Sequence, residues 1–245
     1  MNNQRRTALV TGGSRGIGAA IAQRLAEDGF NIAIAYLRSA GAAEQVAAVC
    51  RDRGVEAEAF QADAASTADM TALTGRVTER FGGLDVLVNN AGITQGCPLE
   101  ETTDEDFERF VNTNVRAVFL ASREAAKVMT PGGRIIIIGS VFGENAPIAN
   151  IGLYVMTKFA VAGFARAWAR DLGPKGITVN CIQPGPVDTD MNPADGGLAE
   201  ILTPRTAIGR YGRATEIAAV VAFLASPASS LVTGACLNVD GGFNA

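Results

Sequence analysis

The sequence contains no histidine, and this absence removes several kinds of active site. Ser-His-Asp and Cys-His nucleophilic sites need an imidazole as general base, and most catalytic zinc sites need one as a ligand. Proton transfer must therefore rely on Asp, Glu, Lys, Tyr or Cys, and we expect no metal site. Tyrosine and lysine are themselves scarce, with three residues of each, so a close pairing of the two types is informative.

Long apolar runs and clusters of positive charge are missing too. No run approaches the roughly 18 apolar residues needed to cross a bilayer, and the N-terminal stretch is too short and too polar for a signal peptide. The net charge of −4 disfavours nucleic acid and anionic membranes as partners. The cysteines are widely spaced, a pattern typical of packing thiols in a reducing compartment, at Cys50, Cys97, Cys181 and Cys236. We therefore predict a cytoplasmic protein.

What the chain does contain is a regular alternation of short apolar runs and longer helical patterns. The expected strands are Thr7–Thr11, Asn31–Tyr36, Glu56–Gln61, Asp85–Asn89, Arg134–Ile138, Thr178–Ile182 and Ala235–Val239. The expected helices are Ile17–Asp28, Ala42–Arg53, Thr67–Phe81, Thr103–Met129, Ile151–Leu172 and Thr215–Ala225. This alternation predicts parallel βαβ units, and four consecutive isoleucines in Arg134–Ile138 indicate a strand covered on both faces. We predict an α/β fold: a single doubly wound Rossmann-type domain, residues 1–245, whose seven-stranded parallel sheet is flanked by helices on both faces.

Residues 184–212 interrupt this rhythm. They are rich in Pro, Gly, Asp and Thr and show no strong period. Long irregular segments in compact domains are usually functional, and this one follows the carboxyl end of a strand, where ligands bind in open α/β sheets. We expect a substrate lid here, with an ordinary surface loop as the alternative.

A glycine-rich turn separates the first expected strand from the first expected helix. It reads Thr11-Gly12-Gly13-Ser14-Arg15-Gly16-Ile17-Gly18. Glycines let the backbone turn tightly and approach a pyrophosphate, while the helix N-terminus offers free N–H groups and a partial positive charge. Between a strand and a helix, such a turn predicts a dinucleotide-binding site.

The spacing T-G-x-x-x-G-x-G of this turn resembles the signature of the short-chain dehydrogenase/reductase superfamily. Further matches run along nearly the whole chain, at Asp63, Asn89-Asn90-Ala91-Gly92, Asn114, Ser140, Tyr154, Lys158, Pro184-Gly185 and Thr189. The nearest overall resemblance is to 3-oxoacyl-(acyl-carrier-protein) reductases. It implies an oxidoreductase that uses a nicotinamide cofactor to interconvert carbonyl and alcohol groups.

The end of the second expected strand favours NADP(H) over NAD. An NAD enzyme normally carries an acid there for the ribose 2′-hydroxyl, whereas this chain reads Tyr36-Leu37-Arg38-Ser39. Arg15 and Arg38 are placed to bind a 2′-phosphate through their guanidinium forks, unless both are simply solvated. By resemblance, the cofactor contacts are Gly12, Ser14, Arg15, Gly16, Ile17, Gly18, Arg38, Ser39, Asp63, Asn90, Ala91, Gly92, Tyr154, Lys158, Pro184, Gly185, Val187 and Thr189.

Tyr154 and Lys158 are four residues apart on an expected helix, so their side chains rise from one face. A phenol ordinarily titrates near 10, and a cation a few ångströms away favours its phenolate form. Composition alone gives roughly a 4% chance of a lysine four residues after some tyrosine in this chain. We therefore predict a proton-transfer pair.

The resemblance implies the remaining catalytic roles. Ser140 is expected to donate a hydrogen bond to the substrate carbonyl oxygen, and Asn114 to hold a water that relays protons to Lys158. The spacing from Ser140 to Tyr154 is one residue longer than in many relatives, so the intervening loop is expected to bulge. Glu144 and Asn145 lie in that loop, where they either touch substrate or are solvated.

The substrate is left open between a 3-oxoacyl thioester and a small ketone, diketone, quinone or sugar. Carrier-docking surfaces in the family are basic near the end of the long helix, and here that stretch has only Lys127, which weakens attraction to an acidic carrier. A second hypothesis is a nucleotide-binding regulator, because residues 186–196 resemble a subgroup for which cyclic-di-GMP binding has been proposed. Retention of the proton-relay residues favours catalysis.

A homotetramer, or else a dimer, is the expected assembly. The helices Thr103–Met129 and Ile151–Leu172 carry more small and apolar residues than one sheet face needs. Residues 237–243 also resemble the tetramer-forming end of the family. The alternative is that the extra apolar surface meets the lid.

Overall fold

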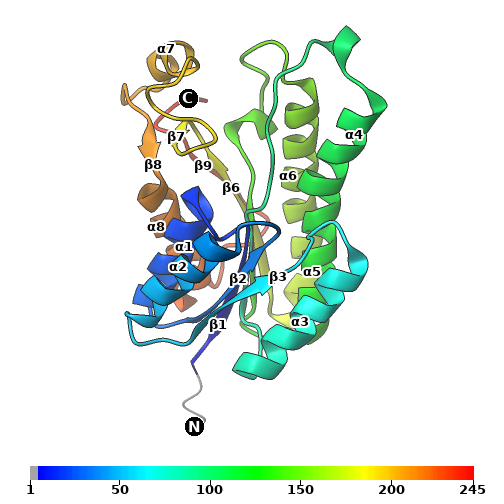
Figure 1. Ribbon diagram of the computed structural model, residues 1–245, viewed down its shortest axis with the longest axis vertical. Coiled ribbons are helices and arrows are strands. Elements are labelled where there is room, and N and C mark those ends of the chain that lie inside the picture. Colours follow the sequence, from blue (N-terminus) through cyan, green and yellow to red (C-terminus); the bar gives the residue numbers. More distant parts are fainter. Residues whose placement is uncertain (1–4) are drawn as a thin grey trace.

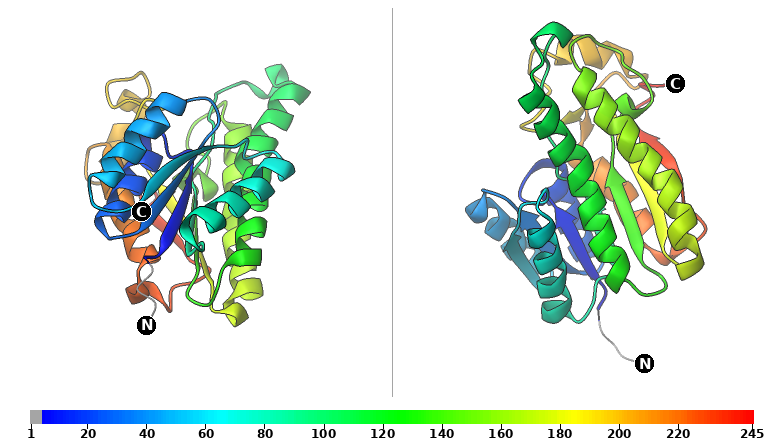
Figure 2. Two further views of the ribbon diagram at one scale, coloured as in Figure 1. Left: turned by 60° about the horizontal axis from the view of Figure 1, so that its bottom comes forward. Right: turned by 90° about the vertical axis from the view of Figure 1, so that its right-hand side faces the viewer.

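The computed structural model describes residues 5–245, and its main feature is one seven-stranded sheet (Figure 1, Figure 2). All its pairings are parallel. The strand order reverses between β1 and β4, as in a doubly wound fold, so the predicted fold class is confirmed. Residues 1–4 of the predicted domain lie outside the described residues. In spatial order the strands are β3 (Ala57–Gln61), β2 (Asn31–Tyr36), β1 (Thr7–Thr11), β4 (Val86–Asn89), β5 (Arg134–Ile138), β6 (Thr178–Pro184) and β9 (Cys236–Val239).

Helices cover both faces of the sheet, as Figure 1 shows. One face carries α1 (Gly16–Glu27), α2 (Ala40–Arg51) and α8 (Ala214–Ala225). The other face carries α3 (Thr67–Phe81), α5 (Ala117–Val128) and α6 (Gly152–Leu172), with α4 (Asp104–Val111) alongside α6.

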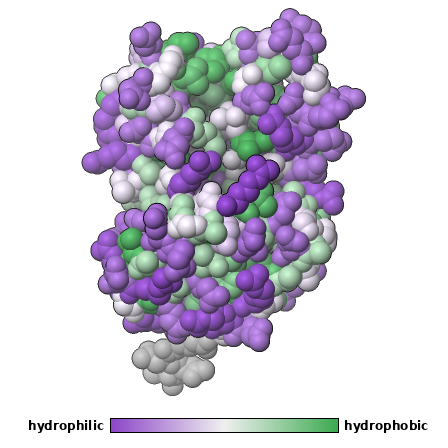
Figure 3. Space-filling model, in the orientation of Figure 1, coloured by the Kyte–Doolittle hydropathy of each residue, from purple (hydrophilic) through white to green (hydrophobic). Residues whose placement is uncertain are grey.

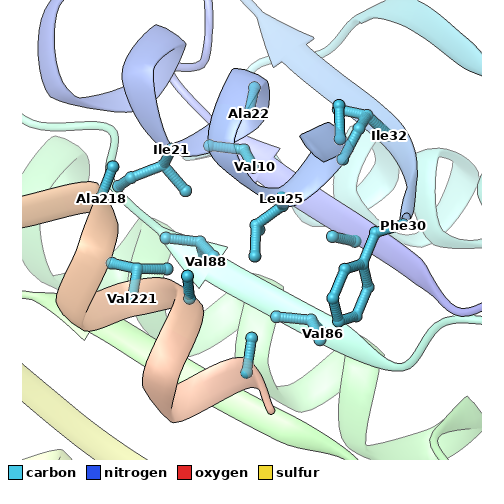
Figure 4. Packing of buried hydrophobic residues seen from close by; sticks show 14 of the residues in the cluster. Val10, Ile21, Ala22, Leu25, Phe30, Ile32, Val86, Val88, Ala218 and Val221 are labelled. Carbon is cyan, nitrogen blue, oxygen red and sulfur yellow. The ribbon is translucent and has the colours of Figure 1, made fainter. Parts of the chain in front are cut away.

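The sheet residues divide between two hydrophobic clusters. Val10, Val86 and Val88 pack with α1 and α8 (Figure 4). In β5, Ile136 joins this cluster while its neighbours Ile135 and Ile137 join the cluster under α3, α5 and α6. A strand that is buried on both faces needs apolar residues at every position, which explains the run of isoleucines.

The helix predicted at Thr103–Met129 is present from Asp104 to Val128, but it is not a regular α-helix throughout. A π-helical turn at Asn112–Arg116 separates α4 from α5. The π-helical turn shifts the backbone hydrogen bonds by one residue, but the apolar residues keep their helical spacing through residues 103–129. The sequence pattern therefore could not reveal the turn. π-helical turns occur frequently at functional sites, and this one contains Asn114.

The segment predicted as irregular, 184–212, contains short elements. Pro184 still belongs to β6, strand β7 (Val187–Asp188) pairs with β8 (Gly212–Arg213), and α7 (Ala199–Leu202) lies between them. In Figure 1, α7 lies beside the C-terminus, beyond the carboxyl ends of the strands. Within residues 5–245, no helix combines the length and hydrophobicity needed to cross a bilayer.

Candidate active site

The predicted site residues gather at the carboxyl edge of the sheet. The glycine-rich turn follows β1, Asn90 follows β4, Ser140 follows β5 and Gly185 follows β6. The strand order reverses between β1 and β4, and the carboxyl edge at such a switch point is where ligands bind in open α/β sheets.

The glycine-rich turn is held against the loop after β4. The side-chain Nδ2 of Asn90 donates to the carbonyl oxygens of Thr11 at 3.1 Å and Gly12 at 3.0 Å. In return, the Thr11 hydroxyl oxygen accepts from the backbone N–H groups of Asn90 and Ala91. A Cβ at Gly18 would lie 2.4 Å from the Gly12 carbonyl oxygen, so only glycine allows the helix to start this close to the turn.

The N-terminus of α1 is suited to bind an anion. Its N-cap residue is Arg15, whose side chain forms no capping hydrogen bond within the described chain, and its first turn contains no acidic residue. The first N–H groups of this 12-residue helix are therefore available for a phosphate. The side chain of Thr189, which follows β7, lies near Gly16, about 3.5 Å from where a Cβ on Gly16 would be. The turn thus has the open N–H groups and small residues that a pyrophosphate requires.

The predicted 2′-phosphate contacts lie at the ends of neighbouring strands. Arg15, Arg38 and Ser39 have exposed or half-exposed side chains at this edge, and Asp63 follows β3. The Asp63 carboxylate accepts from the backbone N–H of Ala65 at 2.9 Å, which shapes the turn into α3.

Asn114 is buried in the π-helical turn and its amide is fully engaged. Its Oδ1 accepts from the backbone N–H of Ile93 at 2.8 Å, while Nδ2 donates to the Ile93 carbonyl at 2.9 Å and to the Thr157 hydroxyl at 3.1 Å. The side chain therefore ties the loop after β4 to α6. Thr157, which is completely buried, was not predicted, because a lone threonine on a helix carries no sequence signal.

Tyr154 and Lys158 lie together on α6, as their spacing predicts. The Lys158 ammonium is 5.4 Å from the centre of the Tyr154 ring and donates to the Ile138 carbonyl oxygen at 3.0 Å. Only 8% of Lys158 is exposed, and it forms no ion pair with any residue between 5 and 245. Burying an unpaired ammonium is costly, so this lysine is placed where a functional partner can use its charge.

Ser140 follows β5, two residues after Ile138, whose carbonyl oxygen accepts the hydrogen bond from Lys158. It is buried, and its Oγ accepts from the backbone N–H of Phe142 at 3.2 Å, which leaves the hydroxyl hydrogen free to donate elsewhere. The Phe142 ring meets the Tyr154 ring edge-on at 6.1 Å between centres. One aromatic contact thus connects the serine turn to the tyrosine helix.

Glu144 is exposed, which agrees with the solvated alternative, and amide side chains also hydrogen-bond its carboxylate. Its partners are the side chains of Gln183, Asn238 and Asn244. Hydrogen bonds, first that from Asn238, lower the pKa of the Glu144 carboxyl group. These three partners lie 39 to 100 residues away in the chain, so no local pattern could predict them.

Two cysteines lie beneath this side of the site. Cys181 on β6 and Cys236 on β9 occupy paired positions on neighbouring strands. Cys236 is the thiol that ionises first: a hydrogen bond from Cys181, aided by the charge of Arg166, lowers the pKa of Cys236 to about 7. On α2, by contrast, burial raises the pKa of Cys50 to about 11.

A separate hollow of about 480 Å³ lies between α1 and α8, at the amino ends of the strands. Its arginines already have partners. Arg6 donates to the Ala225 carbonyl oxygen at 2.8 Å, and Arg24 pairs with Asp28 at 3.3 Å. This hollow is not part of the candidate site.

Comparison with known proteins gives consistent matches over the whole chain. The family model described as enoyl-(acyl carrier protein) reductase matches residues 12–244. A cyclic-di-GMP-binding biofilm dispersal mediator protein of Escherichia coli is 43% identical over 98% of both chains. The 3-oxoacyl-(acyl-carrier-protein) reductase FabG of Staphylococcus aureus is 40% identical over 97% of both chains. A short-chain dehydrogenase of Burkholderia cenocepacia, crystallised with NADP, is 49% identical over 99% of both chains, with a TM-score of 0.97.

Proposed function

Because the chain belongs to the short-chain dehydrogenase/reductase superfamily, we propose that it is an NADPH-dependent carbonyl reductase that reduces a ketone or 3-oxoacyl group to an alcohol. One observation carries this proposal: a buried ammonium without an ion-pair partner among the described residues lies beside the Tyr154 phenol. In a chain without histidine, this pair is the acid–base group best placed for the reaction.

The carboxyl edge of the sheet binds NADP(H). The N–H groups at the start of α1 take the pyrophosphate, and Arg15 and Arg38 take the 2′-phosphate. Binding of this cofactor by the related short-chain dehydrogenase of Burkholderia cenocepacia supports the assignment. The remaining contacts follow the family pattern: Gly12, Ser14, Gly16, Ile17, Gly18 and Ser39 around the phosphates, Asp63 at the adenine, Asn90, Ala91 and Gly92 at the ribose, and Pro184, Gly185, Val187 and Thr189 at the nicotinamide.

NADPH supplies a hydride to the carbonyl carbon when it is bound. Tyr154 donates its phenolic proton to the carbonyl oxygen, and Ser140 holds that oxygen through its free hydroxyl hydrogen. Lys158 stabilises the phenolate left behind and reaches the ribose hydroxyls. Asn114 holds the loop after β4 against α6 through its amide, and it would bind the relay water through its backbone carbonyl oxygen, because that amide is already engaged.

The lid, residues 184–212, closes over the substrate. Met191, Leu198, Ile201 and Ile208 expose about half of their surface there, and Figure 3 shows apolar side chains gathered at the same end of the molecule. An apolar cover fits a ketone or an acyl chain better than a highly charged ligand. The 3-oxoacyl substrate draws its support from the Staphylococcus aureus relative.

A second candidate function is a cyclic-di-GMP-binding regulator, which the Escherichia coli relative supports. Titration distinguishes the two functions. NADPH and cyclic-di-GMP are titrated separately into the protein to measure binding. Ketones, diketones, quinones and acyl thioesters are then added to the NADPH complex. A reductase gives loss of the nicotinamide absorbance with at least one carbonyl compound. Cyclic-di-GMP binding without any loss of that absorbance would overturn the reductase proposal.

We further propose one domain over residues 1–245, a cytoplasmic location and a homotetramer. The four cysteines are free thiols, which suits a reducing compartment. Helices α4, α5 and α6 expose large apolar side chains that suit contact with other subunits, namely Phe107, Phe119, Val128, Met156 and Phe159. Light scattering of the purified protein measures the assembly.

A further inference from the structure

The last residues of the chain lie between the lid and the loop that follows Ser140. On the lid side, the backbone N–H of Ile208 donates to the Gly241 carbonyl oxygen at 3.1 Å. A Cβ at Gly241 would lie 2.7 Å from Ile208 Cγ1, and one at Gly242 would lie 2.6 Å from Ala207 Cβ. The two glycines therefore allow a contact with the lid that no larger residue permits.

On the other side, the same segment contacts the aromatic wall of the site. The Phe243 ring lies 6.2 Å from the Phe142 ring, which in turn meets the Tyr154 ring. A chain of three rings thus runs from the C-terminus to the proton donor. Contacts of this kind favour particular ring orientations, so a displaced Phe243 changes the surroundings of the tyrosine.

Asn244 connects the segment to the loop through hydrogen bonds. Its Nδ2 donates to the Val141 carbonyl oxygen at 3.0 Å and to Glu144 Oε2 at 3.2 Å. Its Oδ1 accepts from the Asn145 side chain. The backbone N–H of Asn244 donates to the Asp240 carboxylate at 3.0 Å, which folds the chain end back on itself. One asparagine therefore binds three positions of a five-residue stretch that begins next to Ser140.

The Glu144 carboxylate accepts hydrogen bonds from three side chains in this region. Besides Asn244, its carboxylate accepts from Gln183 Nε2 at 2.7 Å and Asn238 Nδ2 at 2.8 Å. An ionised carboxylate only accepts hydrogen bonds, so it suits three amide donors. These hydrogen bonds lower the pKa of the Glu144 carboxyl group. Their contribution to stability is present at neutral pH and is lost as the pH falls through this lowered pKa.

We propose that Asp240–Asn244 is a brace that positions Phe142 and Tyr154 relative to the lid, with the Glu144 carboxylate as its anchor. None of these residues is assigned a chemical step; the brace acts through Phe142 and the serine turn. The inference rests on the proposed reductase function, because the wall it positions is the substrate wall. Asp240 packs against Gly185, where a Cβ would lie 2.7 Å from the Asp240 Cα, but the glycine-rich turn that takes the pyrophosphate lies outside the brace. A change at Glu144 is therefore expected to leave the phosphate contacts of NADPH intact.

The test replaces the anchor without changing its size. In Glu144→Gln, an amide nitrogen that cannot accept hydrogen bonds faces amide donors. We expect exchange of the hydrogen-bonded amides of this loop, those of Phe142, Gly143 and Glu144, to accelerate about tenfold, since bonds to a charged group are lost. Exchange in residues 12–18 should stay unchanged. The KM for the ketone is expected to rise, with the NADPH Kd within about twofold of wild type. Glu79→Gln, at an exposed position on α3, is the matched control and leaves all four quantities unchanged.

A chain that ends at Phe243 provides a second variant, because it loses the Asn244 bonds while keeping Glu144. It should show the same pattern. Unchanged exchange of the Phe142, Gly143 and Glu144 amides in both variants overturns the brace, and so does faster exchange with unchanged ketone kinetics. If the reductase proposal fails, the wild type and the variants alike reduce no carbonyl compound. The difference in amide exchange between wild type and variants then still shows whether the brace holds the loop.

Discussion

The two sides of the candidate site are held together in different ways. On the nucleotide side, backbone groups and small residues do most of the work, as where Asn90 bonds to the carbonyl oxygens of Thr11 and Gly12. On the substrate side, side chains bond to side chains across long stretches of sequence, as between Glu144 and Asn238. A pyrophosphate always has the same shape, so a backbone cradle suits it, whereas side chains can be exchanged to suit different substrates. The variants below separate these two sides.

Tyr154→Phe should give the largest effect, and that effect should be on turnover far more than on NADPH binding. It removes the proton donor but keeps the ring that packs against Phe142. We expect kcat to fall by roughly 10²–10⁴-fold, the range for loss of a general acid. The NADPH Kd, measured by fluorescence titration, should stay near that of wild type. Near-native turnover would refute the role of the tyrosine.

The double variant Arg15→Ala/Arg38→Ala should act on the nucleotide side alone. Each charge-assisted bond to a 2′-phosphate contributes about 1.5–3 kcal/mol, so the KM for NADPH is expected to rise by about 10²-fold or more. The KM for NADH, which lacks that phosphate, should change little. Equal losses for both cofactors would mean that these arginines do not recognise the phosphate; Arg170→Ala, at an exposed position on α6, is the control.

Gly18→Ala tests the backbone cradle directly. The added Cβ would lie 2.4 Å from the Gly12 carbonyl oxygen and 2.5 Å from Asn90 Nδ2. Overpacking of this kind typically costs about 1–3 kcal/mol, so we expect a lower Tm and roughly tenfold weaker NADPH binding. Gly163→Ala, on α6 with nothing within 4 Å of the added carbon, is the control and should raise or preserve the Tm. An unchanged Gly18→Ala variant would contradict the tight contact.

The smallest expected effect is a difference in reactivity between two thiols, those of Cys236 and Cys50. Cys236, with a pKa of about 7, should react with iodoacetamide at a rate that rises up to about pH 8 and then levels off. Cys50, buried near the C-terminal end of α2 with a pKa of about 11, should stay unmodified throughout that range. Mass spectrometry of peptides from wild type and Cys236→Ser locates the label. A rate that keeps rising past pH 9 would contradict the lowered pKa of Cys236.

The nucleotide side was also the more predictable one from sequence. Its strand, glycine-rich turn and helix are contiguous, so the periodicity and the spacing of Gly12, Gly16 and Gly18 indicated them directly. The Tyr154–Lys158 pair was equally visible, because both residues lie on one helix. The π-helical turn at Asn112–Arg116 was not visible, since the apolar period of a helix hardly changes when one hydrogen bond shifts register.

The substrate side could be predicted only in part. Composition set residues 184–212 apart from the rest of the chain, and their role as a lid stays a prediction. The short strands β7 and β8 were not predicted, because they pair residues about 25 apart in the chain. The bonds of Glu144 to Asn238 and Asn244 depend on the packing of distant segments. Side-chain networks of this kind form only once the fold has brought the segments together.

The most direct test of the central claim is isotope transfer from NADPH. NADPH deuterated at either face of the nicotinamide C4 is incubated with the protein and a ketone that it consumes, and the alcohol is examined by mass spectrometry. We predict one deuterium on the carbinol carbon from one of the two labelled faces, and none from the other. An alcohol that carries no deuterium from either face would contradict hydride transfer beside Tyr154.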